Sequence, residues 1–162
     1  MDNDTPTARE VQEASLLWAS PERAGEVAAI HAELFAPSWS EEATKTLLEH
    51  PYAASLIAIV GPERDKAGFV LAQVAGDEAE ILSIGVVPKW QRLGLGRRLV
   101  EGLIRAVQRA EARRVFLEVA VDNHAAIKLY DALDFRRVGR RPKYYVRPGQ
   151  DPVDALILAL DF

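Results

Sequence analysis

The stretch that decides the fold reads Gln91-Arg92-Leu93-Gly94-Leu95-Gly96. Upstream, residues 80–87 form an apolar, β-prone run that ends at Pro88, and this pattern predicts a strand. Downstream, apolar side chains recur at helical spacing over residues 95–110, which predicts an amphipathic helix. A helix N-terminus after a glycine turn presents free N–H groups and a positive dipole end. The stretch therefore predicts a phosphate or pyrophosphate site, although Gly94 could equally serve only a tight turn.

The spacing of the glycines separates the classes of nucleotide-binding loop. A dinucleotide-binding fingerprint needs a third glycine where this chain has Leu99. A Walker-type loop needs Lys and Ser or Thr after its last glycine, but Gly96 is followed by Arg97 and Arg98. The pattern that remains, Gln/Arg-x-x-Gly-x-Gly/Ala, resembles the pyrophosphate loop of the GNAT acetyltransferases, which use acetyl-coenzyme A.

This resemblance implies a set of cofactor contacts. Backbone amides of the loop would hold the pyrophosphate, with added positive charge from Arg92 and Arg97. The main chain of the preceding strand would pair with the pantetheine arm, and the Val86 N–H would donate to the thioester carbonyl as in an oxyanion hole. The cofactor-binding residues that it implies are Ile84, Gly85, Val86, Gln91, Arg92, Leu93, Gly94, Leu95, Gly96, Arg97, Asn123 and Tyr130.

A second stretch narrows the resemblance to one branch of the family. Residues 117–135 read Leu-Glu-Val-Ala-Val-Asp-Asn-His-Ala-Ala-Ile-Lys-Leu-Tyr-Asp-Ala-Leu-Asp-Phe. They are similar to the Leu-Glu-Val-Arg, Asn-x-x-Ala-Ile-x-Leu-Tyr and Gly-Phe pattern of the RimI-type ribosomal-protein-alanine acetyltransferases. Residues 35–40, 141–145 and 154–155 resemble further elements of that branch, namely Pro-Trp-Ser, Arg-x-x-Tyr-Tyr and Asp-Ala.

Three residues depart from the branch pattern. Ala120 stands where the branch has Arg, so a charge that would help to hold substrate or cofactor is missing. Asp134 replaces a Gly at the end of a helix, and because Asp adopts the left-handed conformation less easily than Gly, the turn could differ. Ser38 lengthens the Pro-Trp-Ser segment beside the substrate groove. The cofactor half of the resemblance is therefore the stronger half.

The same resemblance assigns the acid–base chemistry to two residues. Glu118 would be the general base, because it lies in an otherwise apolar strand. The alternative for Glu118 is an outward-facing or sheet-edge charge without a catalytic role. Tyr130 would hydrogen-bond to or protonate the coenzyme A thiolate without itself staying ionised, since a phenol pKa of about 10 lies above a thiol pKa of about 8.5. The alternative for Tyr130 is an aromatic side chain packed on the inner face of its helix.

Further residues complete the predicted site. The aromatic residues Trp39, Tyr144 and Tyr145 would form the walls of a peptide groove, or else pack in the core or at its rim. Asn123 would bind the pantetheine arm or act only as a helix N-cap. No metal site is predicted, because the histidines at 31, 50 and 124 lie in separate contexts and the chain has no cysteine.

Composition bounds the remaining possibilities. The chain has 162 residues and a formal net charge of −4, which suits one domain over residues 1–162 and gives no overall case for nucleic-acid binding. Residues 1–12 are expected to form a disordered lead. The absence of cysteine and of a long apolar run favours a cytoplasmic protein without a membrane partner. A basic cluster at residues 136–143 could face an anionic cofactor or an acidic partner.

The course of the chain predicts a mixed α/β fold. Strands are expected at residues 14–19, 54–60, 67–75, 79–87, 115–121, 135–145 and 153–160, and helices at 21–35, 41–49, 94–112 and 123–133. That order agrees with the GNAT fold, a mostly antiparallel seven-stranded sheet flanked by about four helices.

The function that the resemblance implies is acetyl transfer from acetyl-coenzyme A to a protein N-terminal α-amine. The branch suggests the N-terminal alanine of a small-subunit ribosomal protein as the acceptor. Two alternatives stay open: an acetyltransferase for a small-molecule amine or a Lys side chain, and a non-catalytic acyl-coenzyme A sensor.

Overall fold

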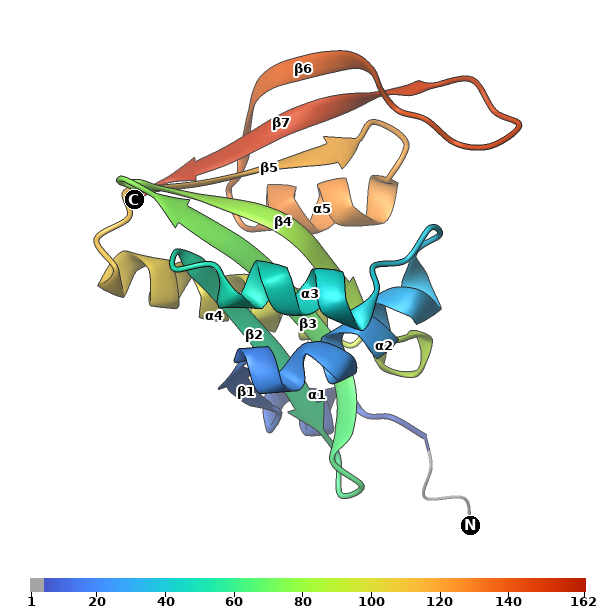
Figure 1. Ribbon diagram of the computed structural model, residues 1–162, viewed down its shortest axis with the longest axis vertical. Helices are drawn as coiled ribbons and strands as arrows, with labels where there is room; N and C mark the ends of the chain where they lie inside the picture. Colours follow the sequence, from blue (N-terminus) through green and yellow to red (C-terminus); the bar gives the residue numbers. More distant parts are fainter. Residues whose placement is uncertain (1–4) are drawn as a thin grey trace.

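The computed structural model describes residues 5–162, which form a seven-stranded sheet with the order β1-β2-β3-β4-β5-β7-β6 (Figure 1). Neighbouring strands are antiparallel except for β4 and β5, which are parallel. The mixed α/β fold is therefore confirmed. The strands are β1 (Ser15–Trp18), β2 (Ala53–Val60), β3 (Asp65–Ala75), β4 (Glu78–Val86), β5 (Arg114–Ala120), β6 (Arg136–Tyr145) and β7 (Val153–Asp161).

The described residues also form five α-helices and two 3-10 turns. They are α1 (Ala8–Gln12), α2 (Ala24–Leu34), α3 (Glu41–Glu49), α4 (Leu95–Arg109) and α5 (His124–Ala132), with 3-10 turns at Pro21–Arg23 and Pro88–Trp90. The helix predicted from residue 21 thus opens with a 3-10 turn. Ser40 caps α3, as its side chain predicts: its Oγ accepts the Ala43 N–H at 3.1 Å.

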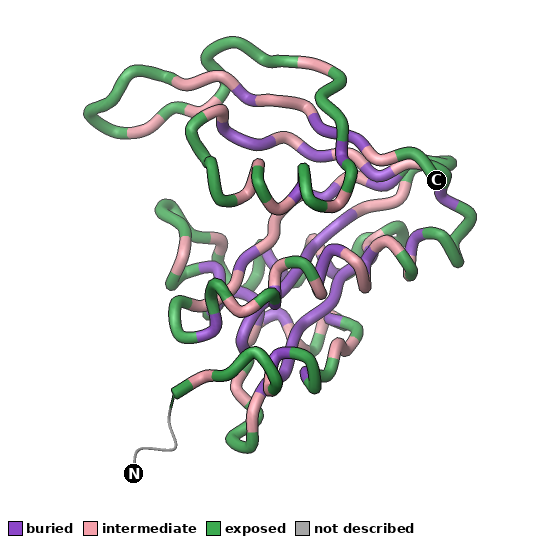
Figure 2. Tube along the Cα trace, turned by 180° about the vertical axis from the view of Figure 1, so that it is seen from behind, coloured by how far each residue is buried: buried purple, intermediate pink, exposed green. Residues whose placement is uncertain are grey.

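The helices cover the two faces of the sheet, and the alternation of side chains along β2 decides which face each helix covers. Leu56 and Ala58 belong to the core cluster that includes α4, whereas Ile57 and Ile59 belong to the cluster that includes α2 and α3. In Figure 1, α3 lies in front of the sheet and α4 behind it. Figure 2 shows the buried residues gathered along the strands between these two layers.

The N-terminal segment corrects one prediction. Residues 8–12, expected to be disordered, form α1, which begins with a capping box between Thr7 and Glu10. Val11 is buried against the α4 side of the core. The Arg98 guanidinium donates to the carbonyl oxygens of Val11 and Gln12, each at 2.6 Å, and so satisfies the helix C-terminus. The prediction failed because the long-range partner in α4 cannot be read from the N-terminal sequence. Residues 1–4 lie outside the described part.

The sheet opens between its two parallel strands. The β4–β5 ladder ends with the pair Ile81 and Leu117, and beyond it the two strands separate, as Figure 1 shows on the side of the molecule away from the C-terminus. A β-bulge coincides with this point, because Leu71 pairs with Ser83 and its neighbour Ala72 pairs with Ile81. Such bulges bend a strand and end its pairing. The gap is therefore a built feature of the fold.

Helix α5 ends in a Schellman motif that keeps the glycine-like conformation at Asp134. The Phe135 N–H donates to the Tyr130 carbonyl and the Asp134 N–H to the Asp131 carbonyl, each at 3.0 Å. The Tyr130 and Phe135 rings lie in contact with their centroids 5.3 Å apart. Asp134 has a φ of 65°, so the turn retains the left-handed conformation that Gly adopts at least cost.

This conformation makes a stability prediction. Asp134→Gly should stabilise the protein by about 1 kcal/mol, because Gly adopts positive φ without the steric cost of a Cβ. The matched control Asp131→Gly, inside the same helix, should instead destabilise by about 0.3 kcal/mol. Unfolding in urea measures both changes, and a loss of stability in the Asp134 variant would contradict the account.

Candidate active site

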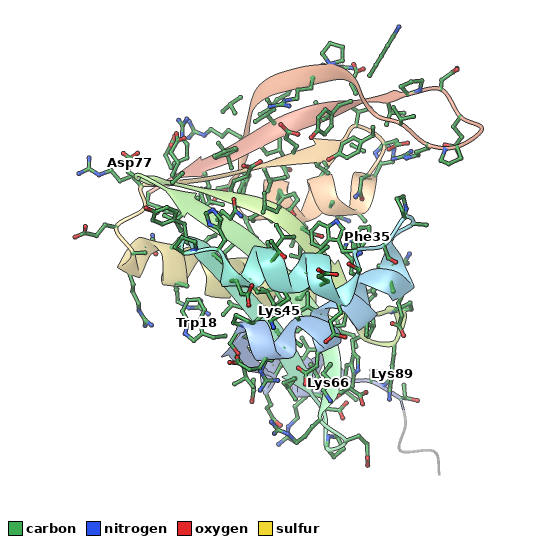
Figure 3. The ribbon with its side chains drawn as sticks, viewed as in Figure 1. Trp18, Phe35, Lys45, Lys66, Asp77 and Lys89 are labelled. Carbon is green, nitrogen blue, oxygen red and sulfur yellow. The ribbon has the colours of Figure 1, made fainter. Side chains whose placement is uncertain are left out.

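A cavity of about 580 Å³ occupies the gap between β4 and β5. Both core clusters border it, so it passes from one face of the sheet to the other. The residues that line it are His31, Leu34, Phe35, Ala36, Pro37, Trp39, Ile81, Leu82, Ser83, Ile84, Leu117, Glu118, Val119, Ala120, Asn123, Ala126, Tyr130, Tyr145, Val146 and Arg147. Figure 3 shows Phe35 beyond the end of α2, beside this gap.

Helix α5 supplies the wall on one side of the sheet. Tyr130 is 3% exposed, packs in the α4 cluster and borders the cavity. Burial raises the pKa of its phenol, so the hydroxyl keeps its proton at neutral pH. Asn123 caps α5 by accepting the Ala126 N–H at 3.2 Å on Oδ1, and it also lines the cavity. Because only the carbonyl oxygen is used in the cap, the amide NH₂ of Asn123 can donate to a ligand.

Glu118 faces the opposite side. Its neighbours Leu117 and Val119 point into the α4 cluster, so Glu118 points to the face that carries α2 and α3. Its side chain is 13% exposed, and Oε1 lies 2.8 Å from Nε of Arg141, whose side chain is 56% exposed. The carboxylate is therefore mostly withdrawn from water and paired with one partly exposed guanidinium. Its place at the cavity is consistent with the predicted role of Glu118.

A set of ionisable groups surrounds Glu118. Burial raises the pKa of Glu80, and the Glu118 charge adds to this rise while Arg141 opposes it. The pKa of Tyr144 is raised chiefly because the Glu118 carboxylate disfavours a phenolate beside it. Burial and then Glu118 raise the pKa of Tyr145, whose hydroxyl donates to the Glu118 main-chain carbonyl at 3.2 Å. Both tyrosines therefore remain neutral hydrogen-bond donors near Glu118.

The glycine loop joins the end of β4 to the start of α4. Gly94, the N-cap of α4, has a φ of 90°, and Arg92 also has a positive φ of 62°. The Gln91 side chain donates to the Val86 carbonyl at 2.8 Å and ties the loop to the strand. Since Gly94 has no side chain, the N–H groups of the first helical turn stay open to an anion. Arg97 is paired with Glu101 at 2.9 Å, so part of its charge is already compensated.

The main chain of β4 offers hydrogen bonds toward the gap. Val87 donates to the Ala67 carbonyl of β3 at 2.8 Å. In an antiparallel ladder these contacts alternate, so Ile84 and Val86 point their N–H and carbonyl groups away from β3. Ile84 lines the cavity, whereas Gly85 is buried against Leu34. The predicted roles of Ile84 and Val86 are consistent with this geometry.

The other predicted residues divide into those at the cavity and those beside it. Trp39 and Tyr145 line the cavity, whereas Tyr144 lies next to Glu118, outside the lining residues. Ala120 is buried and gives a small apolar wall where the branch pattern has Arg. Arg147 brings a cation to the same cavity, paired with Asp122 at 2.5 and 2.9 Å. A guanidinium thus reaches the site from the β6–β7 connection.

Sequence reasoning missed His31. It was considered only as a metal ligand, yet it is buried, lines the cavity and accepts the Trp39 N–H on Nδ1 at 3.1 Å. The one available signal was a His within the apolar face of a helix next to the Pro-Trp-Ser-like segment. Within residues 5–162, no three His, Asp or Glu side chains are placed to hold a metal ion. Nor does this part of the chain contain a helix that could span a membrane.

Comparison with known proteins agrees with this geometry. Residues 24–135 match the model of the acetyltransferase (GNAT) family. The chain belongs to this family. The ribosomal protein bS18-alanine N-acetyltransferase of Escherichia coli is 42% identical over 95 residues, which cover 58% of this chain and 63% of that enzyme. The N-alpha-acetyltransferase RimI of Mycobacterium tuberculosis is 45% identical over 74 residues, 46% of this chain and 45% of that protein. The matches thus span less than two thirds of these relatives.

Solved structures of GNAT proteins extend the match to the whole fold. The crystal structure of the Escherichia coli ribosomal-protein-S18-alanine N-acetyltransferase superposes with a TM-score of 0.83 at 30% identity, covering 91% of this chain and 93% of that one. Arabidopsis thaliana NAA60 in complex with acetyl-CoA gives a TM-score of 0.79 at 21% identity, covering 92% and 98%. The second likeness concerns the fold alone.

The buried phenol makes a prediction for alkaline pH. Because burial raises the pKa of Tyr130, the neutral phenol stabilises the folded state fully below about pH 10 and progressively less above it. Tyr130→Phe should therefore lose less unfolding free energy than the parent between about pH 10 and 11. Urea titrations at both pH values measure this, with Tyr52→Phe as an exposed control that behaves like the parent. An equal alkaline loss in the Tyr130 variant would contradict the prediction.

Proposed function

We propose that this chain transfers the acetyl group of acetyl-coenzyme A to the α-amine of a protein N-terminus. One observation carries the proposal: Glu118 and Tyr130 border a common cavity from opposite faces of the sheet. An acceptor amine on the α2 side would lie near a carboxylate, and a thioester on the α5 side would lie near a neutral phenol. Family membership and the names of the relatives support the same reaction.

The cofactor would lie along β4 and the glycine loop. The open amides at the start of α4 suit a pyrophosphate, and the main chain of Ile84 and Val86 suits the amides of a pantetheine arm. Asn123 would donate to the same arm from α5. The Val86 N–H would then donate to the thioester carbonyl where negative charge develops.

The proposed reaction is a direct transfer. The neutral amine attacks the thioester carbonyl carbon, forming a C–N bond, and Glu118 accepts the proton that leaves the nitrogen. The C–S bond then breaks, and the neutral Tyr130 hydroxyl donates a hydrogen bond to the departing thiolate. The proton that Glu118 accepted passes to solvent, from which the thiolate takes up one proton, so the reaction balances. An α-amine, with a pKa of about 8 against about 10.4 for Lys, costs roughly 3 kcal/mol less to deprotonate, so one carboxylate suffices for it.

As the specific acceptor we propose the N-terminal alanine of a ribosomal protein, following the name of the Escherichia coli relative. The cavity wall around Ala120 and Pro37 is small and apolar, which suits a small first residue. Acetylation of synthetic peptides with Ala, Ser, Met and Lys at the first position, beside a panel of small amines, tests this. Turnover of small amines alone would favour the other enzyme class, and no turnover with intact cofactor binding would favour a sensor.

Loss of the base should separate chemistry from binding. Glu118→Gln is expected to lower kcat by about 10²-fold or more, because the amine loses its proton acceptor. The dissociation constant of acetyl-coenzyme A should stay within about twofold, since Glu118 lies on the opposite face from the predicted cofactor contacts. Acetylation assays quenched at fixed times measure kcat, and calorimetry measures the dissociation constant of acetyl-coenzyme A. Unchanged turnover would remove Glu118 from the mechanism.

Strain in the glycine loop should instead weaken the binding of acetyl-coenzyme A. Gly94→Ala adds a Cβ at a φ of 90° with no atom within 4 Å of it, so it strains the loop without a clash. We expect acetyl-coenzyme A to bind about fivefold or more weakly. Gly76→Ala, at a φ of 62° and also free of contacts, imposes similar strain in the β3–β4 turn and should leave binding unchanged. Calorimetry on both variants decides whether the loop holds the cofactor.

A further inference from the structure

A buried imidazole holds the α2 side of the cavity together. His31 is 4% exposed, and its Nδ1 accepts the Trp39 N–H at 3.1 Å. Its ring stacks on the Trp39 indole with centroids 4.2 Å apart and planes 14° from parallel. The Phe35 ring lies on it at a centroid distance of 4.6 Å. One side chain of α2 thus contacts both ends of the segment 35–39.

The same segment forms the acceptor side of the cavity. Phe35, Pro37 and Trp39 all line it, and they lie on the face of the sheet to which Glu118 points. Residues of this segment belong to no helix or strand. Its position therefore depends on tertiary contacts, and those with His31 include one hydrogen bond and two ring contacts.

The hydrogen bond sets the chemical form of His31. A ring nitrogen accepts a hydrogen bond only when it carries no proton, so Nδ1 must be unprotonated. Burial lowers the pKa of His31, which favours this neutral form. The imidazole is thus available as an acceptor for the Trp39 N–H around neutral pH.

We propose that His31 is a positioning residue that fixes the acceptor-side wall of the cavity by holding Trp39. The inference rests on the proposed function, because it assigns this wall to the peptide. A displaced wall would weaken the contacts that hold the acceptor peptide in the cavity. The cofactor contacts predicted on α4 and α5 would keep their places, since they lie on the other side of the sheet.

Two substitutions separate the two contacts of His31. His31→Phe keeps an aromatic ring for the stack and lacks the acceptor nitrogen, whereas His31→Asn places an oxygen near the position of Nδ1 and lacks the ring. We expect His31→Phe to raise the peptide KM about tenfold, with kcat and the acetyl-coenzyme A KM within about threefold of the parent. His31→Asn should restore the peptide KM to within about threefold. A merely structural role would not produce this split or this rescue.

The chain offers a matched control. His50 also accepts a main-chain N–H on Nδ1, from Tyr52 at 3.2 Å, and its ring lies 5.7 Å from the Tyr52 ring. It is exposed and outside the cavity. His50→Phe should therefore leave both KM values unchanged. Hydrogen exchange of the Trp39 amide gives a readout without turnover, and it should be about tenfold faster in His31→Phe than in the parent or in His31→Asn.

The outcomes distinguish the two claims. If the parent enzyme acetylates no peptide, the proposed acceptor is contradicted. The role of His31 is then decided by amide exchange at Trp39, together with the KM of any small amine that the enzyme acetylates. Equal rises in both KM values, unchanged Trp39 exchange, or an Asn variant as impaired as the Phe variant would each overturn the inference. If His31→Phe does not fold, His31→Asn with a parental KM and slow exchange supports it.

Discussion

The separation of β4 and β5 beyond the pair Ile81 and Leu117 is the constraint on which the rest of the structure depends. A continuous sheet would use the main-chain groups of both strands and leave no passage between its faces. Because the ladder stops at the bulge, β4 keeps free hydrogen-bonding groups and the two faces share a cavity. Glu118 and Tyr130 reach this cavity from different faces for the same reason. In the proposed function, the pantetheine arm would pair with β4 and replace part of the missing ladder.

Much of the fold could be predicted because its signals are local. The glycine turn before α4, the cap at Ser40 and the alternation along β5 each depend on residues within one or two turns of the chain. All seven strands and the longer helices follow from such patterns. Helix α1 did not, because the guanidinium of Arg98 stabilises its C-terminus from a distant part of the sequence.

The candidate site likewise contains features that the sequence could predict and features that depend on the fold. Glu118 and Tyr130 could be proposed from sequence since a family pattern contains both, but the sequence does not show that they lie on opposite faces of a gap. The role of His31 depends on the fold of the 35–39 segment back onto α2, which no periodicity predicts. Asp134 shows the converse case: the residue departs from the pattern and the turn does not, because the two hydrogen bonds of the Schellman motif and the Tyr130–Phe135 contact hold it.

The pairing of Glu118 with Arg141 bears on how the base becomes available. The Arg141 side chain is 56% exposed, whereas that of Glu118 is 13% exposed, so loss of the cation without replacement would leave a largely buried carboxylate unpaired. In the proposed function, an incoming α-ammonium would take the place of the guanidinium and keep the carboxylate paired. Arg141 also lies over the Tyr144 ring at 5.2 Å, which gives its displaced charge a second contact. In the free protein, the Glu118 carboxylate is thus paired with a cation that the proposed acceptor would displace.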